Sequence, residues 1–342
     1  MKDIARQAGV SVTTVSHTLN GTRYVSPQLK QRVVRAAEDL GYRGRGAGRL
    51  DGDSRTVGLL IPSARNLHFM ELYRMLEGAL NQAGHRVLFC CSEEDPDREL
   101  ACLRLFEEKR ADALLLIQGG RTNAILKEIR RNRRPTILID RDPPETDVDR
   151  VLVDNRRGGY EATQHLLALG HRRIAALSGG IEPGPAGERL KGYKDAMVAA
   201  GLEPVVIHRG FDLDGGYHGL RELLLSPNPP TGVFAVNDVT AFGVLHGAAE
   251  QGIAVPRQLS VVGFDDVELA QYAVPSLTTV RQPRREIVAT VVDRLGELFS
   301  GAVQLESKRV ELNGLLVPRR STAAPGETSR NNTASSERFV SS

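Results

Sequence analysis

The chain has 342 residues, of which 41% are hydrophobic and 25% charged, and its net charge is +3. This composition is ordinary for a globular protein, and the length suggests two or three domains, so both a disordered chain and a single small core are excluded. No apolar run approaches the roughly 20 residues that a membrane span needs, and the N-terminus lacks the apolar segment of a signal peptide. We therefore expect a cytoplasmic protein without a membrane partner.

The positive charge is concentrated at the start of the chain. Residues 1–50 contain nine lysines and arginines against three acidic residues, a net charge of +6, so the remaining residues together carry −3. A basic segment joined to a slightly acidic remainder favours a protein that binds nucleic acid through that segment. Cys90, Cys91 and Cys102 have neither metal-ligand spacing nor the even count of a disulfide framework. We expect free thiols, no metal and no cofactor.

Residues 2–20 (KDIARQAGVSVTTVSHTLN) have the pattern of two short helices joined by a tight turn. Ile4 and Ala5 begin the apolar period of the first helix, and the small Ala5 would let the second helix cross closely. Gly9 stands where the turn needs a residue that tolerates positive φ, and Ser11 is placed to cap the second helix. The pattern therefore predicts a helix pair with a defined crossing.

The second of these helices has one apolar and one polar face. Val10 and Val15 are expected to fill the angle between the two helices, which leaves polar side chains on the outer face. These are Thr13, Thr14, Ser16 and His17. The arrangement indicates a helix-turn-helix with a polar recognition helix, although periodicity alone is also compatible with an ordinary helical hairpin.

A third helix is predicted within residues 25–43, where Pro27 suits the first helical position. Its inward face is expected to consist of Val33, Val34, Ala37 and Leu40. Residues 1–43 would then form a small all-α head. The Gly- and Arg-rich residues 44–55 that follow are expected to be a hinge or linker.

From Thr56 onward, short apolar runs alternate with amphipathic stretches, which predicts strands buried on both faces alternating with helices. The strands are expected at residues 57–61, 86–90, 113–117 and 136–139, and in a second series at 174–178, 205–207, 232–236 and 259–264. This alternation predicts an α/β domain with two parallel sheets over residues 56–317. The polar residues 318–342 are expected to form a disordered tail.

Several of these segments resemble the LacI/GalR family of bacterial transcription regulators. TTVSH (residues 13–17) is similar to the recognition helix of the family's purine and ribose repressor branch, VSPQLKQRVVRAAEDLGYR (residues 25–43) looks like its third helix, and further matches run to Val317. The resemblance implies a helix-turn-helix head and a two-lobed, periplasmic-binding-protein-like domain with a ligand cleft between the lobes. It also implies that the chain crosses between the lobes three times, near residues 155, 281 and 315.

The resemblance further implies which residues of the head contact double-stranded operator DNA. They are Val12, Thr13, Thr14, Ser16, His17, Asn20, Arg23 and Tyr24. Of these, Thr13, Thr14 and His17 are expected to face base edges in the major groove, while Ser16 and Asn20 contact phosphate.

In the family, an Ala-x-x-Leu element after the head forms a short hinge helix on operator binding, and its leucine enters the minor groove. Residues 47–50 resemble this element, so Leu50 is expected to act as the wedge. Gly44, Gly46 and Gly48 each weaken a helix here by about 1 kcal/mol relative to Ala. A flexible linker whose arginines follow phosphates is therefore the alternative.

Six residues match family positions that line the effector cleft. They are Phe69, Asp154, Arg189, Phe211, Asn237 and Asp265. Arg189 offers a fork of donors suited to vicinal hydroxyls or a carboxylate, and Asp265 offers acceptors for hydroxyl or ring N–H groups. On the residues alone, Phe69 is also compatible with a place in the core, and Asn237 and Asp265 with helix caps.

The loop at residues 179–188 lacks the Arg and Thr that purine-binding members present there and carries Pro183 and Pro185 instead. A sugar or sugar derivative is therefore the expected effector, with a nucleobase corepressor as the alternative. The function implied is a homodimeric transcriptional repressor that binds a palindromic operator and is switched by this small molecule.

The sequence disfavours two functions from other classes. An enzyme is disfavoured because the sequence has no G-x-S-x-G, Walker, H-E-x-x-H or G-x-G-x-x-G motif in the context that each requires. A sugar-binding protein without a DNA role is disfavoured by the basic head and the missing secretion signal.

Overall fold

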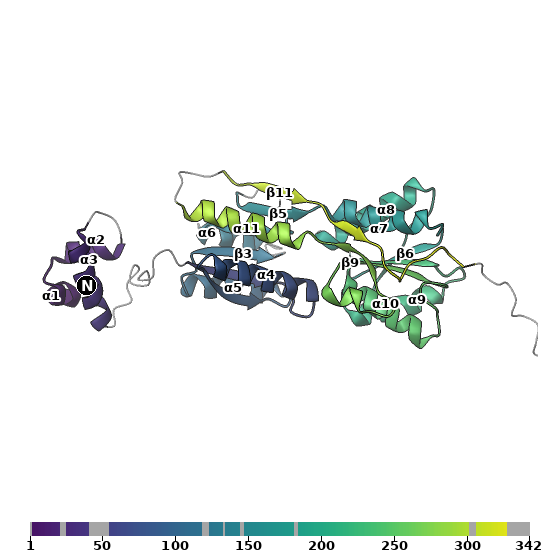
Figure 1. Ribbon diagram of the computed structural model, residues 1–342, viewed down its shortest axis with the longest axis horizontal. Helices are drawn as coiled ribbons and strands as arrows, with labels where there is room; N and C mark the ends of the chain where they lie inside the picture. The colour runs from purple at the N-terminus through teal and green to yellow at the C-terminus, as the bar shows by residue number, and fades with distance from the viewer. Residues whose placement is uncertain are drawn as a thin grey trace, which may run out of the picture. The chain divides into compact units, whose positions relative to one another are not determined.

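The computed structural model describes residues 2–20, 25–40, 55–117, 123–132, 134–143, 147–180, 184–300 and 306–326. They belong to two compact units, a small one that contains the first three helices and a large one that contains the two sheets (Figure 1). Each unit has its own hydrophobic core.

The small unit is a three-helix head. Its helices are α1 (Lys2–Ala8), α2 (Val12–Asn20) and α3 (Pro27–Asp39). Gly9 has a φ of +61°, and a Cβ at that position would lie 2.7 Å from the Arg32 guanidinium, which itself donates to the carbonyl of Ala8. Ser11 caps α2, because its hydroxyl accepts from the backbone N–H of Thr14. The turn expected between the first two helices is therefore present in detail.

The core of the head follows most of the predicted apolar period, but Val34, predicted to face inward, is only half-buried and is not part of the core. Its buried members are Ile4, Ala5, Ala8, Val15, Val33, Ala36 and Ala37, against which Val10 packs. Leu40, predicted to face inward, is 45% exposed. That prediction was wrong because α3 ends at Asp39, so the next residue no longer follows the helical period.

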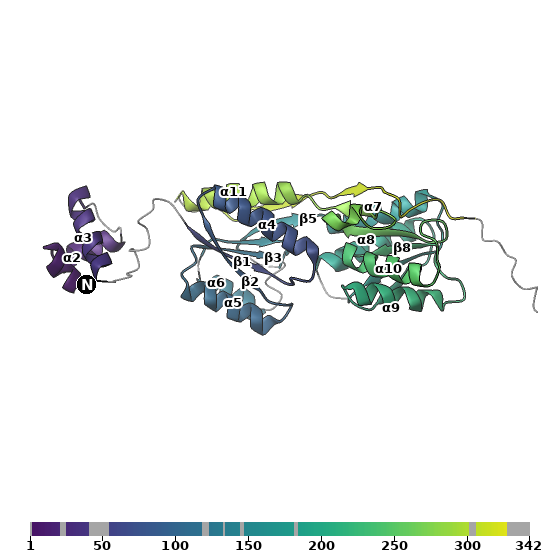
Figure 2. The ribbon, with the colours of Figure 1, turned by 60° about the horizontal axis from the view of Figure 1, so that its bottom comes forward.

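The first lobe of the large unit is a parallel six-stranded sheet in the order β11-β5-β4-β3-β1-β2. Its strands are β1 (Thr56–Ile61), β2 (Arg86–Cys91), β3 (Ala113–Ile117), β4 (Thr136–Ile139), β5 (Asp149–Val153) and β11 (Arg309–Leu312). One face is covered by α4 (Leu67–Gln82) and α11 (Arg284–Phe299), the other by α5 (Pro96–Glu108) and α6 (Asn123–Asn132). Figure 2 shows α4 and α11 side by side over the sheet.

The second lobe is built in the same way, in the order β12-β10-β9-β8-β6-β7, where only the pairing of β12 with β10 is antiparallel. Its strands are β6 (Ile174–Ser178), β7 (Val205–His208), β8 (Gly232–Ala235), β9 (Ser260–Asp265), β10 (Thr278–Arg281) and β12 (Leu315–Val317). One face is covered by α7 (Asn155–Ala168) and α8 (Pro185–Ala199), the other by α9 (Leu213–Leu224) and α10 (Asp238–Glu250). A short 3-10 helix, η1 (Glu268–Gln271), follows β9.

The chain passes between the lobes at three places, after β5, between β10 and α11, and between β11 and β12. These lie beside the expected crossovers at residues 155, 281 and 315. The expected head and two-lobed α/β fold with largely parallel sheets is confirmed. Strands β5, β10, β11 and β12 and helix α11 were not among the predicted elements, because short runs such as DRVLV and TTVR gave no clear period.

The expected disordered tail needs a correction at its start. Residues 318–326 pack on the second lobe: the Ser321 hydroxyl, fully buried, donates to the carbonyl of Val261 and accepts from the N–H of Thr278. Arg319 donates to the Asp266 carboxylate at 2.6 Å. A polar sequence is no sign of disorder where its hydroxyls satisfy groups at the edge of a sheet. Residues 327–342 lie outside the described residues.

Candidate effector site

A cavity lies where the carboxyl ends of strands from both lobes meet. It is lined by Asn66, His68, Phe69, Glu94, Arg141, Gly184, Pro185, Ala186, Gly187, Arg189, Phe211, Val236, Asn237 and Asp265. The first five of these belong to the first lobe and the rest to the second. Parallel sheets place the ends of neighbouring strands at one edge, which is why residues distant in sequence converge here.

Arg189 is the centre of the second lobe's wall. Its side chain is 95% buried on α8, where Nε donates to Asn155 Oδ1 at 2.8 Å and Nη1 donates to the carbonyl of Val236 at 2.8 Å. The guanidinium carbon lies 3.8 Å from the centre of the Phe264 ring. Gly159 on α7 makes this position accessible, because a Cβ there would lie 2.1 Å from the Arg189 carbonyl oxygen. The guanidinium is thus held by contacts on several sides.

Asp265 forms the other half of this wall and is fully buried. Its Oδ1 lies 3.3 Å from Arg189 Nη1 and accepts from Gln282 Nε2 at 2.7 Å, while Oδ2 has no hydrogen-bond partner. Burial raises the pKa of this carboxyl, and the nearby Arg189 cation opposes that rise. One oxygen of Asp265 is therefore already engaged within the protein, and only the other lacks a partner.

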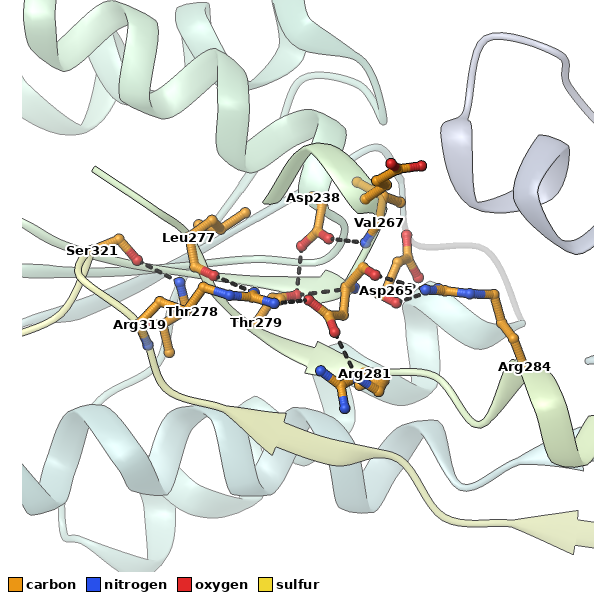
Figure 3. Close-up of polar contacts among 12 residues, drawn as sticks. Asp238, Asp265, Val267, Leu277, Thr278, Thr279, Arg281, Arg284, Arg319 and Ser321 are labelled. Carbon is orange, nitrogen blue, oxygen red and sulfur yellow. Dashed lines mark hydrogen bonds and ion pairs between the residues drawn. The ribbon is translucent and has the colours of Figure 1, made fainter. Parts of the chain in front are cut away.

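The backbone that carries Asp265 is unusual. Asp265 and Asp266 both have positive φ, 113° and 55°. Arg284 stabilises this turn, because its Nη1 and Nη2 donate to the carbonyls of the two aspartates at 2.6 and 2.7 Å (Figure 3). The Asp266 carboxylate accepts from Arg281 and Arg319, each at 2.6 Å. Strained backbone held by its surroundings in this way is typical of a ligand site.

Two further buried carboxylates lie behind the wall. Asp238, at the start of α10, accepts from the Thr279 hydroxyl at 2.5 Å and from the N–H of Val267 at 2.9 Å. Burial raises its pKa well above the ordinary range, and the neighbouring Asp265 adds to that rise. Asp140, in the first lobe, accepts from Asn155 Nδ2 at 2.8 Å, and burial raises its pKa too. Asn155 therefore links Asp140 to Arg189 across the lobe boundary.

The first lobe's wall is formed around the start of α4. Asn66 caps this helix by accepting from the N–H of His68, and the His68 and Phe69 rings meet edge to face with centres 5.4 Å apart. His68 and Phe69 are 3% and 5% exposed. Phe69 thus belongs both to the core of the first lobe and to the cavity lining, so the two readings of this residue are compatible.

The structure brings together five of the six predicted effector residues, Phe69, Arg189, Phe211, Asn237 and Asp265. Asn237 also caps α10, since its Oδ1 accepts from the N–H of Thr240, and its Nδ2 donates to the carbonyl of Phe211. Asp154 is not among the residues that line this cavity. Its carboxylate caps α7 by accepting from the N–H of Arg157, while the following Asn155 turns inward.

Sequence reasoning missed Asn66, His68, Glu94 and Arg141 as cavity residues. Each follows the end of a strand of the first lobe, β1, β2 or β4. A search for polar residues just beyond every predicted parallel strand would have found them.

The outer face of α2 is the candidate DNA-contacting surface of the head. Val12 is 43% exposed and Thr13 is exposed, whereas Thr14, Ser16 and His17 are half-buried. The Thr14 hydroxyl lies 2.9 Å from that of Ser11, so the cap of the helix already engages it. The side chain of Asn20, and all of Arg23, Tyr24 and Leu50 with the proposed hinge at 47–50, lie outside the described residues.

In the described part of the chain, none of the helices is long and apolar enough to span a membrane. The same residues contain no cluster of three or more His, Cys, Asp or Glu side chains that could hold a metal ion.

Comparison with known proteins identifies families that match two parts of this chain. Residues 1–44 match the family described as bacterial regulatory proteins, lacI family, and residues 163–322 match a periplasmic binding protein-like domain. The ribose operon repressor of Escherichia coli strain K12 is 35% identical over 328 residues, covering 94% of this chain and 99% of that protein.

Solved structures similar to this chain also include regulators of the same family. A LacI family transcriptional regulator from Enterococcus faecium, with bound ribose, has a TM-score of 0.72 and 30% identity, covering 79% of this chain and 99% of the other. The lac repressor dimer bound to operator and the anti-inducer ONPF has a TM-score of 0.70 and 25% identity over 94% of this chain and 98% of the other. Helix-turn-helix head, two-lobed body and full-length similarity lead to one conclusion: this chain belongs to the lacI family of bacterial regulatory proteins.

Proposed function

We propose that this chain is a transcriptional repressor that binds operator DNA through α2 and whose DNA affinity is set by a sugar in the cavity. The observation that carries the effector class is the cavity wall: the Arg189 guanidinium and the Asp265 carboxylate supply donors and acceptors, and Phe69 and Phe211 supply apolar ring surface. A sugar presents vicinal hydroxyls and an apolar C–H face, which this combination of groups fits. Two similar proteins, the ribose operon repressor and the regulator with bound ribose, support the same class of effector.

The contacts of the cavity wall support the role of a repressor and not that of an enzyme. Asp265 and Arg189 are engaged with each other and with Gln282, Asn155 and the Val236 carbonyl, so they are held as a binding surface. A nucleobase corepressor is the second candidate, since Asn237 and Asp265 could also meet ring N–H groups.

The switch would act through the contacts between the lobes. Glu71 on α4 accepts from the N–H of Glu268 in the second lobe at 2.8 Å and lies 3.4 Å from Arg284, whose guanidinium also holds the Asp265 turn. Asn155 and Asp140 form a second link. A ligand that binds the open and closed arrangements of the lobes unequally shifts their populations, and the dimer would transmit that shift to the heads.

We place the dimer contact at a groove between α4 and α11. Its centre is apolar, with Met75, Ala79 and Val292 partly buried, and charged residues such as Arg74 and Asp293 surround it. An apolar centre with a polar rim suits association with a second copy, as the dimeric relative leads one to expect. Ala79→Glu should give a monomer in analytical ultracentrifugation, whereas Arg104→Glu, outside the groove on α5, should stay dimeric.

The test of the function is a DNA selection with the full-length protein, followed by titration of sugars and purines onto the selected complex. We expect a two-fold symmetric site and a change in DNA affinity of roughly 5–150-fold with one sugar. His17→Ala should relax the preference at one base pair of each half-site and weaken binding by about 1–3 kcal/mol, while Gln31→Ala on α3 keeps the preference.

Three results would count against the proposal. Selection of no sequence would contradict the repressor role, and an unchanged base preference in His17→Ala would contradict the assignment of α2. A response to purines alone would replace the sugar by the nucleobase.

A further inference from the structure

His68 is a buried histidine in the cavity wall whose ring nitrogen Nδ1 has no polar partner. Its side chain is 3% exposed and Nδ1 is completely buried without a hydrogen bond. Among the residues that the structure describes, no side chain or carbonyl is hydrogen-bonded to Nδ1, and the backbone N–H of the residue donates to Asn66 Oδ1. The ring nevertheless lines the cavity beside Phe69.

Packing does not account for the two nitrogens. A phenyl ring would make the same edge-to-face contact with Phe69 and would avoid leaving a buried polar atom without a partner, which is unfavourable. A buried polar atom of this kind calls for an explanation, and at the wall of a ligand cavity the explanation available is a ligand.

The ring is neutral, which decides what kind of group it can bind. Burial lowers the pKa of His68 well below its ordinary value, and the cations of Arg284 and Arg189 lower it further. A neutral imidazole has one donor and one acceptor nitrogen. A hydroxyl group also donates and accepts, so it can pair with either nitrogen, whereas an ammonium or a carboxylate could use only one of them.

The second lobe's wall also contains a buried polar atom without a hydrogen bond. Asp265 Oδ2 is buried without a partner, and it requires a donor, while Arg189 beside it supplies donors. His68 comes from the first lobe and Asp265 with Arg189 from the second. We propose that His68 is a specificity-determining residue: one hydroxyl of the effector hydrogen-bonds to its ring while other hydroxyls meet Asp265 and Arg189, so that an uncharged polyhydroxylated ligand bridges the two lobes. This inference rests on the proposed sugar effector.

The test compares the wild-type chain with His68→Phe, which keeps a planar ring and removes both nitrogens. A panel of aldopentoses and aldohexoses, starting with D-ribose, is titrated calorimetrically onto the full-length protein, and the tightest sugar is then replaced by its monodeoxy analogues. We expect His68→Phe to bind the parent sugar about tenfold more weakly. One monodeoxy analogue should bind the wild type about tenfold more weakly than the parent sugar, yet bind His68→Phe as well as the parent does. His68→Asn or His68→Gln should restore part of the discrimination.

The unliganded proteins give an independent readout. Because the phenyl ring removes a polar atom without a partner, His68→Phe should unfold at a temperature about 2–4 °C higher than the wild type while binding sugar more weakly. A histidine that served only the fold would give a lower unfolding temperature. Phe69→Leu is the matched control: it should lower affinity for all the monodeoxy sugars alike, since it removes ring surface and no hydrogen bond.

The outcomes separate this inference from the function it builds on. A sugar that binds both proteins equally, with the same ranking of monodeoxy analogues, would overturn the role of His68 and leave the sugar effector intact. A panel in which no sugar binds the wild type would overturn both.

Discussion

The two walls of the cavity differ in how their polar groups are satisfied. In the second lobe, Arg189 and Asp265 are tied to each other and to Asn155, Gln282 and the Val236 carbonyl. In the first lobe, Nδ1 of the His68 ring has no hydrogen bond within the described residues.

This difference separates positioning from response. A wall whose side chains are already fixed loses little conformational entropy when a ligand arrives, so it can hold the ligand in one orientation. In the second lobe's wall only Oδ2 of Asp265 lacks a partner, beside groups that are otherwise fixed. The His68 ring is not fixed by a hydrogen bond at Nδ1, so the first lobe gains relatively more from the ligand, and its position relative to the second lobe is what ligand binding changes. The second lobe thus serves as the template and the first lobe as the part that closes on it.

The largest expected effect comes from breaking the template. Arg189→Ala leaves the Asp265 carboxylate buried without its cation and Asn155 without its donor, so the free energy of unfolding should fall by about 3–5 kcal/mol. Urea unfolding of the full chain measures it. The exposed Lys191→Ala, two residues along α8, is the control and should change stability by less than about 0.5 kcal/mol.

This expectation revises how effector mutants are interpreted. If these two side chains served only the effector, Arg189→Ala and Asp265→Asn would leave DNA binding intact and lose only the effector response. Because both side chains are structural members of the second lobe, loss of response in Arg189→Ala would not by itself locate the ligand. If Arg189→Ala had the same free energy of unfolding as the wild type, the claim that the second lobe's wall is fixed before the ligand binds would be wrong.

A second prediction concerns the layer behind the template. Thr279→Val keeps the side-chain shape but removes the donor to Asp238 Oδ1, which should cost about 1–3 kcal/mol of folding free energy. The pKa of Asp238 is already raised by burial, and loss of this donor raises it further. Since a group with a raised folded pKa loses stability as pH rises from its unfolded pKa toward its folded pKa, the cost should be smaller near pH 4 than at pH 7. Equal costs at both pH values, in paired denaturant titrations, would argue against an ionisable Asp238.

The first lobe's wall predicts a pH dependence of opposite sign. The pKa of His68 is lowered in the fold, so the unfolded chain binds more protons as pH falls below the ordinary value of 6.5. Wild-type stability should therefore drop as the solution is acidified below that value, and His68→Phe should drop less, by up to about 1.4 kcal/mol per pH unit. His165 and His171, whose pKa values are also lowered by burial, contribute equally to both proteins and cancel. Parallel stability curves for the two proteins would show that His68 stays accessible to protons.

The smallest effect is expected at the contact between the walls. Glu71→Gln retains an acceptor for the N–H of Glu268 and removes the charge facing Arg284, so it should cost less than about 1 kcal/mol of stability. Its effect should instead appear as faster hydrogen exchange at the Glu268 amide. Glu77→Gln, also on α4, is the control and should leave that exchange rate unchanged.

Features that depend on residues close together in the sequence were predicted well, and features that depend on residues far apart were predicted less well. The head was predicted well because Gly9, Ser11 and the apolar period act within a few residues of each other. The cavity residues at ends of long apolar strands were found through family resemblance, and the structure gathers them at one place. Only the fold shows that Asp154 caps α7 while Asn155 reaches Arg189, so the sequence could not distinguish the contacts of these two neighbours.

The state of the buried groups could not be predicted. Whether Asp265 is paired depends on Gln282 and Arg189, which come from different elements, and the unsatisfied ring of His68 is a property of its surroundings alone. The docking of residues 318–326 was missed for the same reason, since Ser321 is polar in sequence and fully buried in the fold.

The late position of the second and third crossovers has a consequence for biosynthesis. The first lobe needs α11 and β11, and the second needs β12 and Ser321, all of which lie in residues 284–326. A ribosome moving from the N-terminus therefore exposes both sheets before either can be completed, whereas the head has all its helices after about forty residues. Nascent chains should acquire DNA affinity long before they acquire a finished sugar site, and the open edges of β5 and β10 are the surfaces that a chaperone would need to cover in the interval.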